Sequence, residues 1–131
     1  MKKLLVSTIT SLLLIFAYQA SISAQAWAFL GASKVHGHAD HDEILVTGLK
    51  GDFSAIKLMV ENEGIQFDRV VVHFANGGKQ ELVLRDFIAA GGETRVMDLT
   101  GRDRIIRAVD FFYKSNVMTK RKGKVLLYGS R

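Results

Sequence analysis

The amino-acid sequence predicts an all-β protein, an antiparallel β-sandwich of about eight strands with a jelly-roll or Greek-key arrangement. Short apolar runs are separated by turn residues at intervals of roughly 8–12 residues, which is typical of sandwiches and small barrels. No segment of the mature portion carries the 3.6-residue period of a helix, and the runs lie too close together for the helical crossovers that parallel strands need. A closed small barrel is the alternative fold.

The chain begins with a segment that has the layout of a secretory signal peptide. Met1–Lys3 is basic, residues 4–18 are mostly apolar, and Ala24-Gln25-Ala26 has small residues at the positions that a signal peptidase recognises. The apolar stretch is shorter than the roughly 20 residues of a membrane-spanning helix. We therefore expect residues 1–26 to be removed, and residues 27–131 to form a single exported domain, either periplasmic or secreted.

The composition of the mature portion narrows the classes of function. Removing 26 of 131 residues leaves 105, with 16 basic and 13 acidic side chains and a net charge of +3. This mild excess differs from the dense basic surface of a nucleic-acid binder, so we expect no nucleic-acid partner. The chain has no cysteine, so the domain is stabilised without disulfides by its core.

The apolar pattern gives the order of the strands and their inward faces. Alternation in residues 56–60 directs Ile56, Leu58 and Val60 to one side and Lys57 and Met59 to the other. The expected strands, in order, are 27–35, 44–47, 56–60, 65–74, the run around Leu82 and Leu84, 94–99, 105–113 and 125–128.

Four details refine this pattern. The apolar residues of the run 65–74 change phase in its middle, which predicts a bulge near Asp68-Arg69. Asn76-Gly77-Gly78 is the strongest hairpin signal in the chain. Residues 105–113 are apolar on both faces, as in a central strand, and we expect Phe87 and Ile88 to close an open end of the core.

From Trp27 onward the chain resembles a family of small exported bacterial proteins known only as a domain of unknown function. The resemblance covers nearly the whole mature portion and implies an exported β-rich domain, with no established activity and no catalytic residues. It is carried by Leu30-Gly31, Asp40-His41-Asp42 before Ile44 and Val46, Phe53, residues 56–60, Asn76-Gly77, residues 91–98, Gly101, residues 104–113 and Leu127-Tyr128-Gly129.

A histidine- and aspartate-rich tract is the sharpest candidate for chemistry. Imidazole and carboxylate groups are ligands for zinc, copper or nickel, and alternate residues of an extended segment share a face. His73 on a predicted strand is a further donor if that strand passes nearby. The structural alternative is a solvated loop with turn-forming aspartates. A third interpretation is a calcium site formed by Asp40, Asp42, Glu43 and Asp52. The candidate metal ligands are His36, His38, Asp40, His41 and Asp42.

Basic residues in the last third of the chain form a second candidate site. If they share one edge, they attract an anionic partner such as a glycan, a lipid head group or an acidic protein. The alternative is a solvated hairpin whose charges discourage aggregation. The candidate anion-binding residues are Arg104, Arg107, Lys120, Arg121, Lys122 and Lys124.

Aromatic side chains are the third feature. Sugar-binding sandwiches stack their ligands on exposed rings, but alternation assigns most rings here to the core, and only Trp27 stands out as a candidate for exposure. Motifs of nucleophilic and phosphate-binding enzymes are missing. We therefore expect a non-catalytic binding or interaction module without a cofactor. The alternatives are a periplasmic metal-binding protein and a small glycan or peptide hydrolase.

Overall fold

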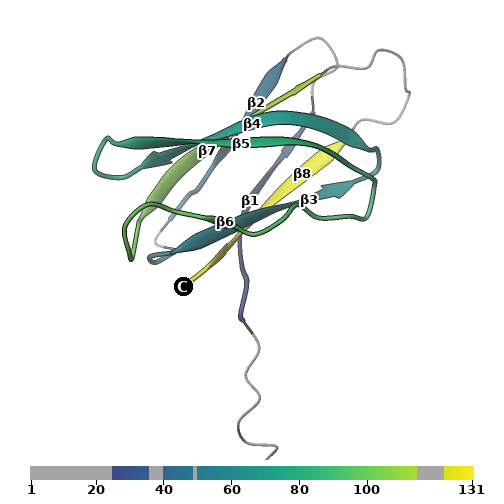
Figure 1. Ribbon diagram of the computed structural model, residues 1–131. Coiled ribbons are helices and arrows are strands. Elements are labelled where there is room, and N and C mark those ends of the chain that lie inside the picture. Colours follow the sequence, from purple (N-terminus) through teal and green to yellow (C-terminus); the bar gives the residue numbers. More distant parts are fainter. Residues whose placement is uncertain (1–24, 36–39, 49, 115–122) are drawn as a thin grey trace, which may run out of the picture.

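The computed structural model describes residues 25–35, 40–48, 50–114 and 123–131 and folds them into two packed β-sheets (Figure 1). Eight strands and no helix make up the regular structure of these residues. The strands are β1 (Ala28–Lys34), β2 (His41–Leu45), β3 (Ala55–Glu61), β4 (Ile65–Phe74), β5 (Lys79–Ile88), β6 (Met97–Asp98), β7 (Ile106–Lys114) and β8 (Lys124–Ser130).

The strand order identifies the topology. One sheet has the order β1-β8-β3-β6 and the other the order β2-β7-β4-β5, and all of their strand pairs are antiparallel. Successive strands alternate between the sheets except at the β4–β5 hairpin. This is the order of an eight-stranded jelly roll, so the predicted sandwich is confirmed.

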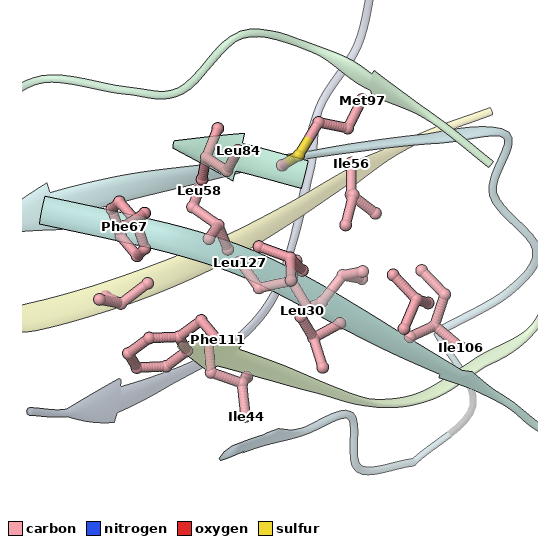
Figure 2. Packing of buried hydrophobic residues seen from close by; sticks show 14 of the residues in the cluster. Leu30, Ile44, Ile56, Leu58, Phe67, Leu84, Met97, Ile106, Phe111 and Leu127 are labelled. Carbon is pink, nitrogen blue, oxygen red and sulfur yellow. The ribbon is translucent and has the colours of Figure 1, made fainter. Parts of the chain in front are cut away.

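The core lies between the sheets and is built by alternate residues of each strand (Figure 2). In β3, Ile56, Leu58 and Val60 are fully buried, as the alternation predicts, while Lys57 and Met59 stay partly accessible. Phe67 and Phe111 meet in the core with ring centroids 6.1 Å apart. Removal of this apolar surface from water supplies the main stabilisation of the domain.

The long strand β4 contains the expected bulge. Its pairing with both neighbours shifts register between Phe67 and Arg69, which lets Phe67 and Val70 face the same interior. The β4–β5 hairpin also forms where predicted: Gly77 has a positive φ of 91°, and the Gly78 amide donates a 2.9 Å hydrogen bond to Asn76 Oδ1. Both features follow from the sequence pattern.

Three local expectations differ from the structure. β2 begins at His41, so the end of the polar tract is already strand. The expected strand 94–99 is reduced to Met97–Asp98, because Thr94 pairs with β3 partly through its side chain: the Leu58 amide donates to Thr94 Oγ1 at 3.0 Å. Phe87 is 58 % exposed and lies over Gly64, so only its neighbour Ile88 is buried in the core.

The two sheets approach closely where β1 passes β2. A Cβ atom placed on Gly31 would lie 2.9 Å from Cγ2 of Ile44 and 3.0 Å from the carbonyl oxygen of Leu45. Glycine is therefore needed at this point of β1. In the residues that the structure describes, no helix has the length and apolarity to cross a membrane.

Candidate functional site

The outward side of the sheet β1-β8-β3 carries a continuous set of partly accessible apolar side chains, which we call the aromatic face. Register places Phe29 opposite Tyr128, and Ala32 and Met59 on either side of Leu126. The Phe29 and Tyr128 rings meet edge-to-face with centroids 5.6 Å apart, and Phe29 is 50 % exposed. The aromatic face consists of Trp27, Phe29, Ala32, Met59, Leu126 and Tyr128.

A lysine is held at one end of the aromatic face. Lys57 pairs with Tyr128 in the sheet, its Nζ lies 4.4 Å from the centre of the Trp27 ring, and it is 3.2 Å from Oε2 of Glu93. The Lys57 side chain is only 14 % exposed, whereas that of Glu93 is 51 % exposed. The cation–π contact and the ion pair together fix the Trp27 ring against the sheet.

Two further lysines face each other at the opposite end of the aromatic face. Lys34 on β1 is the register partner of Lys124 on β8, and Glu61 on β3 is the partner of Lys124 on its other side. Side chains directly opposite in an antiparallel pair have Cβ atoms about 4.5–5.5 Å apart, and like charges at that spacing repel. The carboxylate of Glu61 offsets one of the two positive charges, so the pair retains an excess positive charge.

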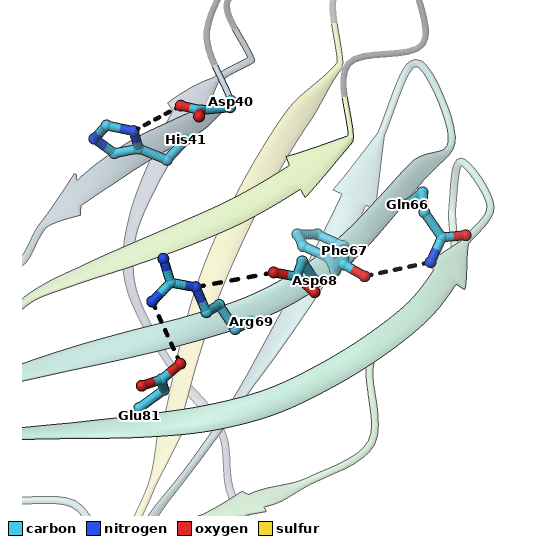
Figure 3. A network of polar contacts seen from close by, with 7 residues as sticks. All are labelled: Asp40, His41, Gln66, Phe67, Asp68, Arg69 and Glu81. Carbon is cyan, nitrogen blue, oxygen red and sulfur yellow. Dashed lines mark hydrogen bonds and ion pairs between the residues drawn. The ribbon is translucent and has the colours of Figure 1, made fainter.

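The outward side of the other sheet has a different chemistry (Figure 3). The Phe112 ring on β7 lies between two side chains: His41 stacks on it at 5.0 Å between centroids, and the guanidinium carbon of Arg69 lies 3.9 Å from its centre. Arg69 also contacts Glu81 at 3.3 Å and Asp68 at 3.9 Å. This face pairs charges across its strands, and it also carries the exposed apolar side chains of Leu45, Val83 and Phe87.

A histidine–aspartate pair lies on the same face. His73 Nε2 on β4 lies 2.8 Å from Oδ2 of Asp110 on β7. Glu43 on β2 is the register partner of Asp110, so a second carboxylate lies across the strands from the aspartate that His73 contacts. From β2 to β4, the cross-strand row that contains His73 consists of Leu45, Ala108 and His73. On β2 this row therefore carries an apolar leucine and no residue of the polar tract.

The structure disperses the described part of the predicted metal tract. His41 and Asp42 are successive residues of β2 and point to opposite faces. Asp42 accepts a 2.7 Å hydrogen bond from the Tyr113 hydroxyl, while His41 lies 3.1 Å from Oδ1 of Asp40 at the surface. Asp52, a residue of the calcium interpretation, lies 3.8 Å from Nε of Arg131.

Within the described ranges, no group of three or more His, Asp or Glu side chains is arranged to hold a metal ion. His36 and His38 lie outside the described residues. The described contact of His73 is with Asp110, which is not a residue of the tract.

The hydrogen bond between Asp40 and His41 has an electrostatic consequence. It lowers the pKa of the Asp40 carboxyl below its ordinary value of 3.8, with a smaller contribution from a backbone hydrogen bond. Asp40 therefore carries its negative charge at neutral pH beside the imidazole of His41.

The three predicted basic residues that the structure describes are spread along the length of the sandwich. Arg104 lies just before β7, where its guanidinium carbon is 3.6 Å from the centre of the Phe74 ring and Nη1 donates a 2.6 Å hydrogen bond to the Thr100 carbonyl. Arg107 is exposed on β7. Lys124 begins β8, beyond the far end of β7, whose nine residues span about 30 Å. Lys120, Arg121 and Lys122 lie outside the described residues.

Sequence reasoning missed most of the aromatic face. It named only Trp27 as a candidate for exposure and assigned most of the other rings to the core, without singling out Phe29 or Tyr128. Residues 125–128 are apolar in both alternating rows, so one row had to leave the core, and Val125 and Leu127 are the buried pair. The same alternation therefore contained the signal for an apolar outer face.

The fold defines a jelly-roll sandwich with the aromatic face on one sheet and charged pairs beside exposed apolar side chains on the other. The chain belongs to the family described as Domain of unknown function (DUF2541), whose profile matches residues 6–129. This confirms the resemblance to a family of that description. No curated protein has a sequence that matches this chain.

A solved structure has a similar fold. The chain is similar to part of Pseudomonas aeruginosa AlgX, the subject of a structural and functional characterisation, with a TM-score of 0.51 and 10 % sequence identity over 79 % of this chain. The match covers 27 % of the AlgX chain, so this chain corresponds to about a quarter of that protein. At this identity the likeness shows the fold alone.

Proposed function

We propose that this protein is an exported, non-catalytic binding module that holds an anionic extracytoplasmic partner on the aromatic face. The observation that carries the proposal is the contiguity of that face: two rings and three aliphatic side chains lie on neighbouring strands, and the Trp27 ring just before β1 lies beside them, outside the packed core. Large accessible apolar patches on soluble domains mark interaction sites. Lys57 is paired with Glu93, whereas the facing Lys34 and Lys124 leave an excess positive charge at the other end, which favours a negatively charged partner.

Export is the second part of the proposal, and it rests on residues 1–26. The basic start, the apolar run and the small residues at Ala24 and Ala26 support cleavage before Trp27. N-terminal sequencing of the protein recovered from the periplasm or the medium tests it. We expect a chain that starts at Trp27, and an uncleaved chain that stays in the cytoplasm would contradict this part.

Binding is tested with a matched pair of phenylalanine variants of the full-length gene product. Phe29→Ser removes a half-exposed ring from the aromatic face, and Phe87→Ser removes an equally exposed ring from β5 of the other sheet. Three anionic probes, polygalacturonate, phosphatidylglycerol vesicles and polyglutamate, are titrated at low ionic strength. We expect at least one to bind the parent, about tenfold more weakly after Phe29→Ser and unchanged after Phe87→Ser. Binding that resists both changes, or no binding, would contradict the proposed site.

A further inference from the structure

From the layout of the aromatic face we infer the chemical class of the partner: an acidic polysaccharide whose sugar rings stack on Phe29, Tyr128 and Trp27 and whose carboxylate lies between Lys34 and Lys124. This inference rests on the proposed function, and it deepens it by naming one of the three anionic classes.

The first argument is the shape and chemistry of the rings. The face is the outward side of the sheet β1-β8-β3-β6, one of the two layers of the sandwich, so an extended ligand can lie along it (Figure 1). A pyranose ring has an apolar side of C–H groups and an edge of hydroxyl groups. The rings of Trp27, Phe29 and Tyr128 match the apolar side, while the carboxylate of Glu93 and the ammonium of Lys57, 3.2 Å apart, lie beside them as acceptor and donor for hydroxyl groups.

The second argument is the separation of rings from charge. Along β8 the aromatic row ends at Tyr128, the aliphatic row is at Leu126, and the lysine row is at Lys124. Four residues of strand cover about 13 Å. A ligand that uses both ends must therefore be extended and must carry its negative charge away from the stacked unit, as a short stretch of an acidic polysaccharide does.

The third argument is the facing lysine pair. Lys34 and Lys124 are direct cross-strand partners, an arrangement that repels, and Glu61 is a register partner of Lys124 but not of Lys34. An anion bound between the two ammonium groups would relieve this repulsion. A membrane surface could contact the apolar patch and the lysines together, but it offers no flat ring to stack on the aromatic side chains. An unstructured acidic peptide has no flat apolar side either.

The decisive experiment uses two polysaccharides that differ only in charge. Polygalacturonate and its carboxyl-reduced, neutral counterpart are titrated calorimetrically against the full-length gene product in low salt. We expect polygalacturonate to bind at least about tenfold more tightly. Lys34→Gln should remove most of that difference, whereas Lys79→Gln, an exposed lysine at the start of β5, should preserve it. Phe29→Ser should weaken both ligands, and the thermal midpoint of each variant verifies folding.

The outcomes separate this inference from the proposed function. Binding of phosphatidylglycerol vesicles or polyglutamate alone, weakened by Phe29→Ser, would overturn the polysaccharide and leave the binding module standing. Equal affinity for the charged and neutral polysaccharides would overturn the role of the lysine pair. No binding of any probe would overturn both proposals.

Discussion

The ring of Phe53 occupies the space where a side chain at Gly129 would lie, so Phe53 packs directly against the backbone of β8. A Cβ atom on Gly129 would lie 2.8 Å from Cδ1 of Phe53 and 2.9 Å from Cδ1 of Leu30. Gly129 follows Val125 and Leu127 on the inward row of β8, and it is the point at which that row needs no side chain. The absence of a side chain is therefore a packing requirement of the core.

This relationship predicts the effect of a single methyl group. Gly129→Ala should lower the free energy of unfolding by about 1–3 kcal/mol, because Phe53 or the backbone must move. Urea denaturation measures the change. Combining Gly129→Ala with Phe53→Leu should cost less than the two changes added together, because the smaller side chain makes room. Strict additivity would show that the two residues do not compete for this space.

The buried face of β4 predicts a much larger effect. Val72 is completely buried, so Val72→Asp places a carboxylate in the core without a partner and should unfold a domain whose total stability is about 5–15 kcal/mol. Val83→Asp is the matched control, since Val83 is 53 % exposed on the neighbouring strand. Circular dichroism should show loss of strand signal only for Val72→Asp. A folded Val72→Asp protein would mean that the other face of β4 is the buried one.

The hydrogen bond from Tyr113 to Asp42 predicts a moderate effect at the edge of the core. Tyr113→Phe removes the 2.7 Å bond and should lower the free energy of unfolding by about 1 kcal/mol. Tyr128→Phe removes a hydroxyl from the aromatic face and should change stability by less than about 0.5 kcal/mol. Thermal melts of both variants in one buffer provide the comparison, and equal midpoints would remove the structural role of the bond.

The contact between Asp40 and His41 predicts a dependence on pH. The folded-state pKa of Asp40 is below the ordinary 3.8, so this interaction stabilises the fold above about pH 3.8 and is lost as the pH falls through the lowered pKa. Carbon-13 NMR of the Asp40 carboxyl should show the low titration, and His41→Ala should move it back toward 3.8. An unchanged titration would assign the shift to other groups.

Metal addition tests the histidine- and aspartate-rich tract. A ligand held only by the folded protein adds about 2.7 kcal/mol at 100 times its dissociation constant. Because Asp42 points inward to Tyr113 and His41 points outward, we expect zinc, copper and calcium to leave the thermal midpoint unchanged. A rise with zinc that disappears in His36→Ala or His38→Ala would restore the metal interpretation.

The fold could be predicted well because the alternation of apolar and polar residues in most strands indicates which face is buried. The phase change in residues 65–74 located the bulge at Phe67/Arg69, and Asn76-Gly77-Gly78 located the hairpin. The length of β6 was not predictable in this way, since it depends on the side chain of Thr94 replacing part of a ladder. Phe87 also escaped prediction, because its neighbour Ile88 and not Phe87 falls on the inward row.

The candidate site was harder to predict than the fold. Alternation separates two rows of a strand, but where both are apolar, as in residues 125–128, it does not say which row another layer will cover. The pairing of Phe29 with Tyr128 depends on β1 lying beside β8, and these strands are at opposite ends of the mature sequence. Likewise, Arg104 and Lys124 belong to the same basic part of the sequence, but Arg104 precedes β7 and Lys124 follows it, so the strand separates them.

The position of β8 has a consequence for folding during synthesis. The strand β8 lies between β1 and β3 in the first sheet. Until residues 124–130 have been synthesised, β1 therefore has no strand to pair with in that sheet. Nascent chains of this kind cannot close early. Formation of the complete sheet β1-β8-β3-β6 therefore has to follow synthesis of residues 124–130.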